Sequence, residues 1–441
     1  MLSLKPHKSA WPLGTLAGVL VLALAGAAAL PDLRAEDTTA TAAARKAEEV
    51  KAAEAKAAAQ EATEAKPRLE IYGAAMLDMG YETGISDPNW FDVARPSKLP
   101  SSQAQADSWG KNGHWFMGVR QSRLGFKGYL PTKLGDIKTI FEFELFGTGV
   151  DAGQTTFRLR HAYGELGHFG FGQTWSPFMD PDVFPNSLEY WGPNGMVFFR
   201  NVQARWMPIM GATTVTIALE RPGASADQGV YQDRVELEGV KARFPLPDLS
   251  VQVRRAGKWG HVQLAGMLRQ MRWDDLNDDE YDLSGKATGW GVHLSTNLIV
   301  KKDTLRASVL YGEGIENYMN DAPVDVGIQN NFGDPLTPVV GKALPIFTFV
   351  AFFDHTWSDK LTSTVGYSMA DITNTDAQAA DAFKRGDYAL VNLLYYPTSN
   401  VFLGPELQWV RRENWKDGWS VDDFRIQFSA KYSFSASIGG K

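Results

Sequence analysis

Arginine side chains at alternate positions carry the most definite chemistry in this sequence. In the stretch 155–165, Arg158 and Arg160 alternate with Phe157 and Leu159. Alternate side chains of a strand point to opposite faces, so the two guanidinium groups share a face that the apolar side chains do not. A guanidinium group can hold a carboxylate through two parallel hydrogen bonds. The pattern therefore predicts a strand surface that binds anions.

The preceding stretch, 136–147, carries acidic residues in the same alternating arrangement. Glu142 and Glu144 lie between apolar residues, and opposite charges on adjacent strands stabilise each other. We therefore expect the two glutamates to face Arg158 and Arg160 across the sheet. The same alternation places further residues on this face: Arg123, Lys127, Arg205, Arg254 and Arg269 as candidate solute-binding residues, with His261, Arg306, Glu406, Gln408, Arg425 and Lys431 beside them.

Other site chemistry is sparse. The seven histidines occur singly, without the His-x-His or His-x-x-x-His spacing of a zinc site. Asp275, Asp278 and Asp279 lack the ligand order and turn glycine of a calcium loop, and the absence of cysteine excludes thiolate chemistry. We therefore expect no enzyme activity, no cofactor and no metal. The net charge of −7 argues against a nucleic-acid partner, because the chain has no overall positive field.

The N-terminal region differs in composition from the rest of the chain. Residues 1–35 combine Lys5 and Lys8 with an apolar run that ends in small residues and Pro31, which predicts a signal peptide. A membrane-spanning helix is the alternative. Residues 36–67 are rich in Ala, Glu and Lys, which favours a helix. This helix is either a solvated spacer or a coiled coil that joins several chains.

From Leu69 onward the hydrophobic pattern has a period of two, which is typical of strands with one apolar face. Most of the segments approach the about nine to eleven residues that a tilted strand needs to cross a bilayer. We expect sixteen strands, near 69–82, 114–130, 136–147, 155–165, 168–175, 200–207, 212–220, 249–256, 260–273, 287–300, 304–312, 344–357, 360–372, 386–397, 400–413 and 422–434.

The connections between these segments alternate between long and short. The connections 83–113 and 176–199 are long, for example, whereas "PIMG" and "GKW" are tight turns. This alternation is typical of an outer-membrane barrel, with tight periplasmic turns and longer outer loops, and a soluble sandwich has no reason to keep it. We therefore predict an all-β transmembrane barrel over 68–434, followed by an extension at 435–441. Its lipid face would include Phe157, Leu159 and Tyr163.

One long connection is unusually stiff and aromatic. The stretch "GQTWSPFMDPDVFPNSLEYWGPNG", residues 172–195, contains four prolines and five aromatic residues. Proline limits the freedom of the backbone and suits an ordered loop. We expect residues 176–199 to fold into the barrel and narrow it, with an external cap over a trimer centre as the alternative. The candidate residues of this constriction are Trp175, Asp180, Asp182 and Glu189, and the acids either pair with arginines or set a field across the pore.

Several longer motifs resemble the DcaP-like outer-membrane porins. They are "SRLGFKG" (122–128), "LRHAYGELGHFGFGQTWSPFMD" (159–180), "YGEGIENY" (311–318) and the C-terminal pair "GPELQWVRRENWKDG" and "DDFRIQFSAKYSF" (404–418 and 422–434). The resemblance implies a homotrimer of sixteen-stranded barrels, a periplasmic coiled coil and uptake of small anions, such as dicarboxylates, through an arginine-rich constriction. It also implies contacts with outer-membrane lipid and lipopolysaccharide, and with the barrel-assembly machinery, for which such barrels end on an aromatic residue, here Phe434.

Two functions follow from these patterns. The first is passive diffusion of small hydrophilic anions through an outer-membrane porin. The alternative is a structural barrel that anchors the envelope through its periplasmic helices.

Overall fold

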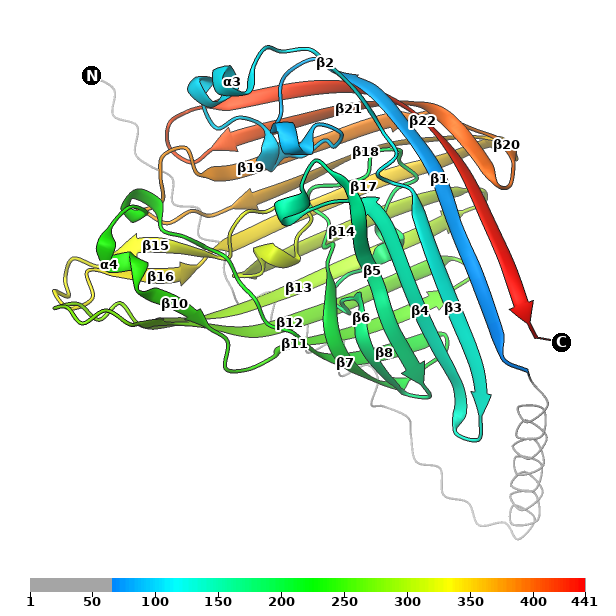
Figure 1. Cartoon of the computed structure of the whole chain (residues 1–441), viewed down its shortest axis with the longest axis horizontal. Helices are drawn as coiled ribbons and strands as arrows, with labels where there is room; N and C mark the ends of the chain where they lie inside the picture. The colour runs from blue at the N-terminus through cyan, green and yellow to red at the C-terminus, as the bar shows by residue number, and fades with distance from the viewer. Residues whose placement is uncertain (1–65, 441) are drawn as a thin grey trace, which may run out of the picture. The chain divides into compact units, whose positions relative to one another are not determined.

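The structure is a computed structural model that describes residues 66–440. The predicted signal peptide, and the predicted helix up to residue 65, lie outside the described residues. Within the described part, antiparallel strands form a closed barrel, because β1 (Arg68–Glu82) pairs along its whole length with the last strand, β22 (Ser420–Gly439) (Figure 1). Closure leaves the spanning sheet without free edges, which bilayers require of strands.

The barrel wall contains sixteen strands in the described part of the chain, as the sequence predicts. β2 (His114–Gly118) and β3 (Arg123–Thr132) both pair with β1 and form one interrupted strand, and β19 (Phe383–Asn392) and β20 (Leu394–Thr398) form another. The others are β4 (Gly135–Phe146), β5 (Thr155–Leu166), β6 (Phe169–Trp175), β7 (Arg200–Ile209), β8 (Thr213–Glu220), β11 (Asp248–Gly257), β12 (Gly260–Asp275), β13 (Gly285–Val300), β14 (Asp303–Glu313), β17 (Pro345–Ser358), β18 (Leu361–Ile372) and β21 (Val401–Asn414).

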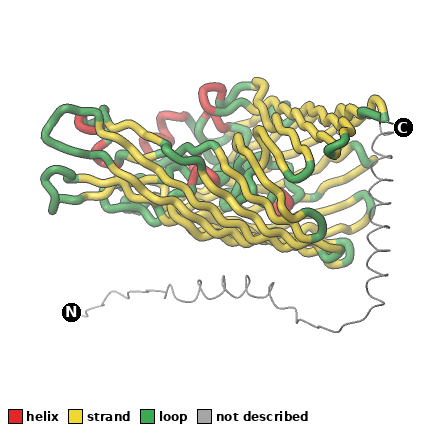
Figure 2. Tube along the Cα trace, turned by 90° about the horizontal axis from the view of Figure 1, so that it is seen from below, coloured by secondary structure: helices red, strands yellow, loops and turns green. Residues whose placement is uncertain are grey.

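The remaining elements lie in the long connections, and strands make up nearly all of the wall (Figure 2). A short strand, β10 (Val240–Arg243), extends the sheet beside β12, and a separate small sheet combines β9 (Ala226–Asp227), β15 (Val326–Asn330) and β16 (Val339–Ala343). In the described residues no helix is long and apolar enough to cross a membrane. The helical elements are α3 (Gln103–Trp109) and α4 (Val235–Glu238), with η1 (Pro88–Trp90), η2 (Pro96–Lys98), η3 (Gly149–Asp151), η4 (Pro181–Val183), η5 (Gly229–Tyr231) and η6 (Glu316–Tyr318).

The last strand is longer than the sequence pattern indicates. β22 continues past Phe434 to Gly439, and its residues from Ser435 onward pair with β1 up to Arg68 opposite Gly439. Residues 435–439 therefore belong to the sheet, so the predicted boundary between a barrel ending at 434 and an extension at 435–441 is wrong. Their alternation of serine with alanine or isoleucine is too weakly apolar to identify a strand, and the pairing with β1 supplies the missing constraint.

Strand alternation separates the outer and inner faces of the wall. On β4, Phe141 is exposed on the outside, whereas Glu142 and Glu144 are buried on the inside. The prediction that Tyr163 on β5 faces lipid is wrong, because the pairing of β4 with β5 shifts by one residue between Leu159 and His161. A bulge of this kind reverses the faces of the residues that follow it. Tyr163 accordingly lies inside, where its hydroxyl donates to Glu165 at 3.0 Å.

Candidate functional site

A compact cluster of charges lies on the inner face of β3, β4 and β5. Arg160 donates from Nε to Glu142 at 2.5 Å and from Nη1 to Glu144 at 2.6 Å. The side chain of Arg158 lies 3.6 Å from Glu144. Arg123 lies 3.6 Å from each glutamate. The expected pairing of glutamates with arginines across neighbouring strands is therefore present.

The same cluster recruits Arg200 from the start of β7, at 3.6 Å from Glu144. Four guanidinium groups, those of Arg123, Arg158, Arg160 and Arg200, thus surround two carboxylates, which leaves a formal excess of two positive charges. Hydroxyl groups complete the hydrogen bonding of the acids, since Tyr72 donates to Glu142 at 2.6 Å and Tyr190 donates to Glu144. The cluster therefore carries a net positive charge, although Glu142 and Glu144 both have hydrogen-bond partners.

Lys431 on β22 adds a further positive charge. Within residues 66–440 no carboxylate oxygen comes within ion-pairing distance of its Nζ, which lies over the ring of Phe402, 5.6 Å from the ring centroid. Lys431 lines two cavities inside the barrel, of about 360 and 280 Å³, and both cavities also contact Gln121 and Arg123. The first cavity reaches Ser399 and Asn400 in a short turn at the barrel end where β1 begins and β22 ends. The second contacts Arg160 and the 176–199 segment.

Residues 176–199 lie inside the barrel rather than over its mouth. Tyr190 bonds to Glu144 on β4, Asp180 to His261 on β12, and the Leu188 amide to Glu406 on β21 at 2.7 Å. These strands lie on different sides of the wall, so only a segment that crosses the interior can touch all of them. The segment also approaches β18 closely, because the Gly195 amide donates to Ser368 at 2.8 Å and a Cβ at Gly195 would overlap the carbonyl oxygen of Met369.

The three acidic residues of this segment have different surroundings. Asp180 is fully buried and accepts hydrogen bonds from His261, from Ser295 at 2.6 Å and from Arg254 at 3.1 Å. Asp182 pairs with the other Nη of Arg254, and its side chain is 52% exposed. Asp180 and Asp182 are therefore tied to the β11–β13 side of the wall. They are held by Arg254 and His261 on that side of the wall and do not pair with the arginine cluster.

Glu189 is buried within the segment and acts as an internal anchor. It accepts hydrogen bonds from the backbone amides of Ala94, at 2.9 Å, and of Gly192. Burial disfavours the carboxylate and raises the pKa of Glu189 to about 7. Glu189 is only 2% exposed and holds the connections 83–113 and 176–199 together, although it also borders the second cavity.

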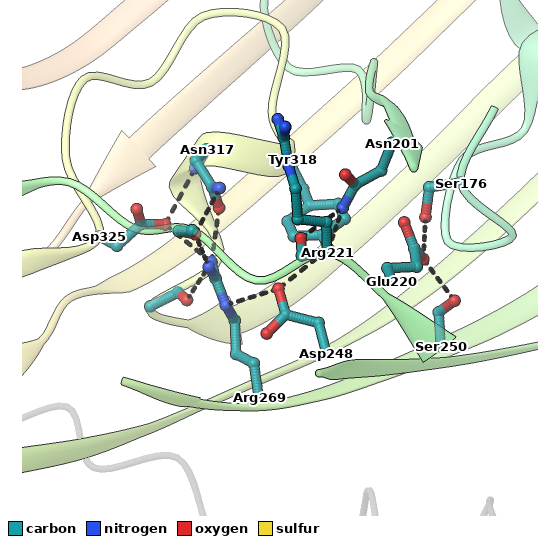
Figure 3. A network of polar contacts seen from close by, with 12 residues as sticks. Ser176, Asn201, Glu220, Arg221, Asp248, Ser250, Arg269, Asn317, Tyr318 and Asp325 are labelled. Carbon is teal, nitrogen blue, oxygen red and sulfur yellow. Dashed lines mark hydrogen bonds and ion pairs between the residues drawn. The ribbon is translucent and has the colours of Figure 1, made fainter. Parts of the chain in front are cut away.

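Arg254 and Arg269 also act as structural anchors, because their ion pairs join wall strands to long connections. The Arg269 side chain has no exposed surface, and it pairs with Asp248 at 3.3 Å and with Asp325 at 3.2 Å (Figure 3). Its remaining donors meet Asn317 and the carbonyl oxygens of Gly223 and Gly314. Arg269 therefore joins β12 to the outer connections and cannot line an open pore as the alternation predicts. In the same network Ser176 and Ser250 both donate to Glu220, at 2.7 and 2.5 Å. The bond from Ser176 holds the start of segment 176–199 against the wall.

Arg205 and Lys127 flank the charge cluster. Arg205 donates to the Trp175 carbonyl oxygen at 2.6 Å, and its guanidinium lies 5.1 Å from the ring centroid of Tyr163. Lys127 lies 3.8 Å from Glu70 and 4.6 Å from the Tyr72 ring centroid. Of the predicted solute-binding residues, the structure thus gathers Arg123, Arg158 and Arg160 in one cluster and distributes the others around the wall.

Asp180, Asp182 and His261 also place three potential metal ligands within 4.8 Å of one another. Arg254 already occupies both carboxylates, and Ser295 donates to Asp180. A cation at this position would have to displace a guanidinium group. The donor set therefore fits an anchoring ion pair better than a metal site.

The sequence pattern does not identify Arg200 and Phe198 as residues of this site, because both lie where segment 176–199 meets β7. Alternation on β7 directs Asn201, Gln203 and Arg205 inward, so Arg200 should point outward, yet its side chain is 5% exposed and pairs with Glu144. Phe198 precedes β7 and lies 5.2 Å from Trp175, between ring centroids. No periodic signal identifies either residue, because the backbone turns at this point. The aromatic run Phe198–Phe199 is the only local sign in the sequence.

Comparisons with known proteins agree with this architecture. Residues 40–434 match the model of the family described as DcaP outer membrane protein. The crystal structure of the outer membrane channel DcaP of Acinetobacter baumannii is similar, with 21% identity, a TM-score of 0.68, and coverage of 83% of this chain and 97% of that chain. The anion-selective porin from Comamonas acidovorans (10% identity, TM-score 0.53) and the trimer form of OmpT of Vibrio cholerae (12% identity, TM-score 0.50) each cover 83% of this chain, and 100% and 99% of their own. A search of curated protein sequences finds no match.

Proposed function

The chain belongs to the DcaP outer membrane protein family, a family of outer-membrane channels of Gram-negative bacteria, and from this premise we propose that it is a porin for the passive diffusion of small hydrophilic anions, dicarboxylates among them. Segment 176–199 forms the constriction, and the arginine cluster with Lys431 forms its basic wall. Solutes move down their gradient without any covalent step, so the protein is not an enzyme.

The observation that carries this proposal is the uncompensated charge beside the two cavities. Four arginines surround two glutamates, and Lys431 lines the same cavities without a carboxylate partner among the described residues, so the formal excess of this group is three positive charges. Charges of one sign inside a narrow, low-dielectric channel focus the potential and concentrate solutes of the opposite sign. Rings of arginine or lysine are the usual device of anion-selective pores.

The arrangement of donors favours passage over tight binding. The Arg123 side chain is 33% exposed and makes only long contacts, of 3.6 Å, with the two glutamates. Lys431 has no carboxylate partner among the described residues, so both side chains can replace water around a carboxylate in the cavities that they line. Glu142 and Glu144 compete for the same guanidinium groups and limit the affinity. Moderate affinity at several neighbouring positions lets an ion enter and also leave.

We further propose that the protein is a homotrimer in contact with outer-membrane lipid and lipopolysaccharide, inserted by the barrel-assembly machinery. The similar fold of OmpT of Vibrio cholerae in its trimer form supports the trimer. The exposed apolar side chains on the outer face of the wall, such as Phe171 and Trp206, suit lipid or another protomer. No contact within residues 66–440 favours the envelope-anchor function over the channel.

Planar-bilayer recording of the purified protein under a KCl gradient tests the proposal. The reversal potential should show that chloride is more permeant than potassium, and Arg123→Gln with Lys431→Gln should shift it toward the cation side. Lys286→Gln is the matched control, because this lysine lies at the outer end of β13 and lines neither cavity. Potassium preference in the wild type, or no conductance from folded protein, would defeat the proposal.

A further inference from the structure

An aromatic strip adjoins the charge cluster and lines the same cavity of about 280 Å³. Trp175, Phe198 and Phe184 form it, with ring centroids 5.2 Å apart for Trp175 and Phe198 and 6.0 Å apart for Phe198 and Phe184. All three side chains are half-buried, whereas Phe178 and Val183 of segment 176–199 are fully buried in the core. The strip therefore keeps ring surface open toward the cavity.

Cations fix one end of this strip and leave the other free. The Arg200 guanidinium lies over Trp175, 4.7 Å from its ring centroid, and also over Phe198 at 5.5 Å. Arg160 lies over Trp175 from the β5 side at 5.5 Å. Within the described residues no cation lies over Phe184. A solute in the cavity thus meets a free aromatic surface at Phe184 and positive groups at the partly exposed Arg123 and at Lys431.

The geometry points to a substrate class narrower than small anions: carboxylates that carry an aromatic ring. The inference rests on the anion-porin function proposed above and deepens it. Arg123 and Lys431 bind the carboxylate, and the ring packs against Phe184 and Phe198. Every group needed for this mixed recognition lines one cavity.

The size of the cavity and the strength of the contact both suit a permeating aromatic acid. A cavity of about 150 Å³ accommodates benzene, so about 280 Å³ accommodates a benzene ring with a carboxylate and some of its water. One aromatic pair adds enough to favour an aromatic acid over a saturated one of similar shape by about 2- to 10-fold. This preference is large enough to measure and small enough to allow release.

The experiment compares benzoate with cyclohexanecarboxylate on the full-length protein in planar bilayers. Both are monoanions of similar size, and only benzoate has an aromatic face. We expect benzoate to interrupt the chloride current half-maximally at about 2- to 10-fold lower concentration. Phe184→Leu, which retains an apolar side chain but removes the ring, should bring the ratio close to one, and Phe184→Ala should do the same.

Two further variants separate the contributions. Arg123→Gln should weaken the block by both acids to a similar extent, because it removes a carboxylate contact. Phe349→Ala, which deletes an aromatic ring from the outer face of β17, should keep the wild-type ratio. Equal block by the two acids in a channel that still prefers chloride to potassium would overturn the aromatic selectivity alone. Loss of chloride preference in the wild type would instead overturn the underlying porin proposal.

Discussion

The hydroxyl of Tyr190, on the segment that crosses the barrel, donates a hydrogen bond to Glu144 on β4. The Tyr190 ring also stacks on Phe146 of the same strand, with centroids 4.1 Å apart and planes inclined by 13°. Glu144 is the carboxylate that Arg160, Arg158 and Arg200 share. One side chain therefore links the position of the inner segment to the charge cluster.

Tyr190→Phe tests this link directly. The substitution keeps the stacked ring and removes a hydrogen bond to an ionised group, which costs about 1.5–3 kcal/mol. We expect a lower melting temperature of the detergent-solubilised protein and larger fluctuations of the open-channel current. Tyr129→Phe is the control, because Tyr129 lies near the short turn that joins β3 to β4 and its hydroxyl has no side-chain acceptor among the described residues. Unaltered current and stability in Tyr190→Phe would show that stacking alone holds the segment.

Arg254 anchors the other end of the segment, since it pairs with both Asp180 and Asp182. Arg254→Gln should release residues near η4 while His261 and Ser295 still hold Asp180. Losing charge-assisted hydrogen bonds of about 1.5–3 kcal/mol should raise the single-channel conductance and add sub-conductance states. The adjacent Arg255, whose guanidinium bonds only to the Thr213 hydroxyl among the described residues, provides the matched control Arg255→Gln. Equal conductance in both variants would count against Arg254 as an anchor.

Glu189 should make stability depend on pH. Burial raises its pKa from the ordinary value of 4.5 to about 7 in the folded protein, so the folded state holds the proton more tightly than the unfolded state. The neutral Glu189 carboxyl therefore makes its full contribution to the free energy of unfolding below about pH 4.5, and this contribution is lost as the pH rises through about 7. Thermal unfolding in detergent should give a higher melting temperature at pH 5 than at pH 8, and Glu189→Gln should reduce this difference. A variant with the same pH dependence as the wild type would exclude Glu189 as its source.

The final residues should matter for assembly, because residues 435–439 complete the pairing of β22 with β1. A chain that ends at Phe434 loses the partners of Arg68 to Tyr72 and exposes that edge of β1. We expect a smaller fraction of folded barrel, measured as heat-modifiable migration on a denaturing gel. Deletion of only Gly440 and Lys441, which follow the strand, should leave that fraction unchanged. Equal folding of both deletions would mean that the last five paired residues are dispensable.

The sequence by itself determined the barrel. Alternating apolar and polar residues identify the strands, and the alternation of long and short connections gives their order in the wall, because every wall strand pairs with the next one along the chain except at the closing pair of β1 with β22. The same periodicity gave the inward facing of Glu142, Glu144, Arg158 and Arg160, although Arg160 is itself the extra residue of the bulge in β5. It failed at Tyr163, where a one-residue shift in pairing reverses the faces, and at Arg200, where the strand has only begun.

Only the tertiary structure decided which charges remain available to a solute. Arg269 and Arg123 have the same strand alternation, yet Arg269 meets Asp248 and Asp325 in full burial, whereas Arg123 borders two cavities. Likewise Asp182 is exposed and Glu189 is not, although both lie in one segment. The partners that neutralise or bury these groups come from connections distant in sequence. Because burial and pairing depend on such long-range contacts, local spacing can place a charge on the inner face but cannot say whether it stays free.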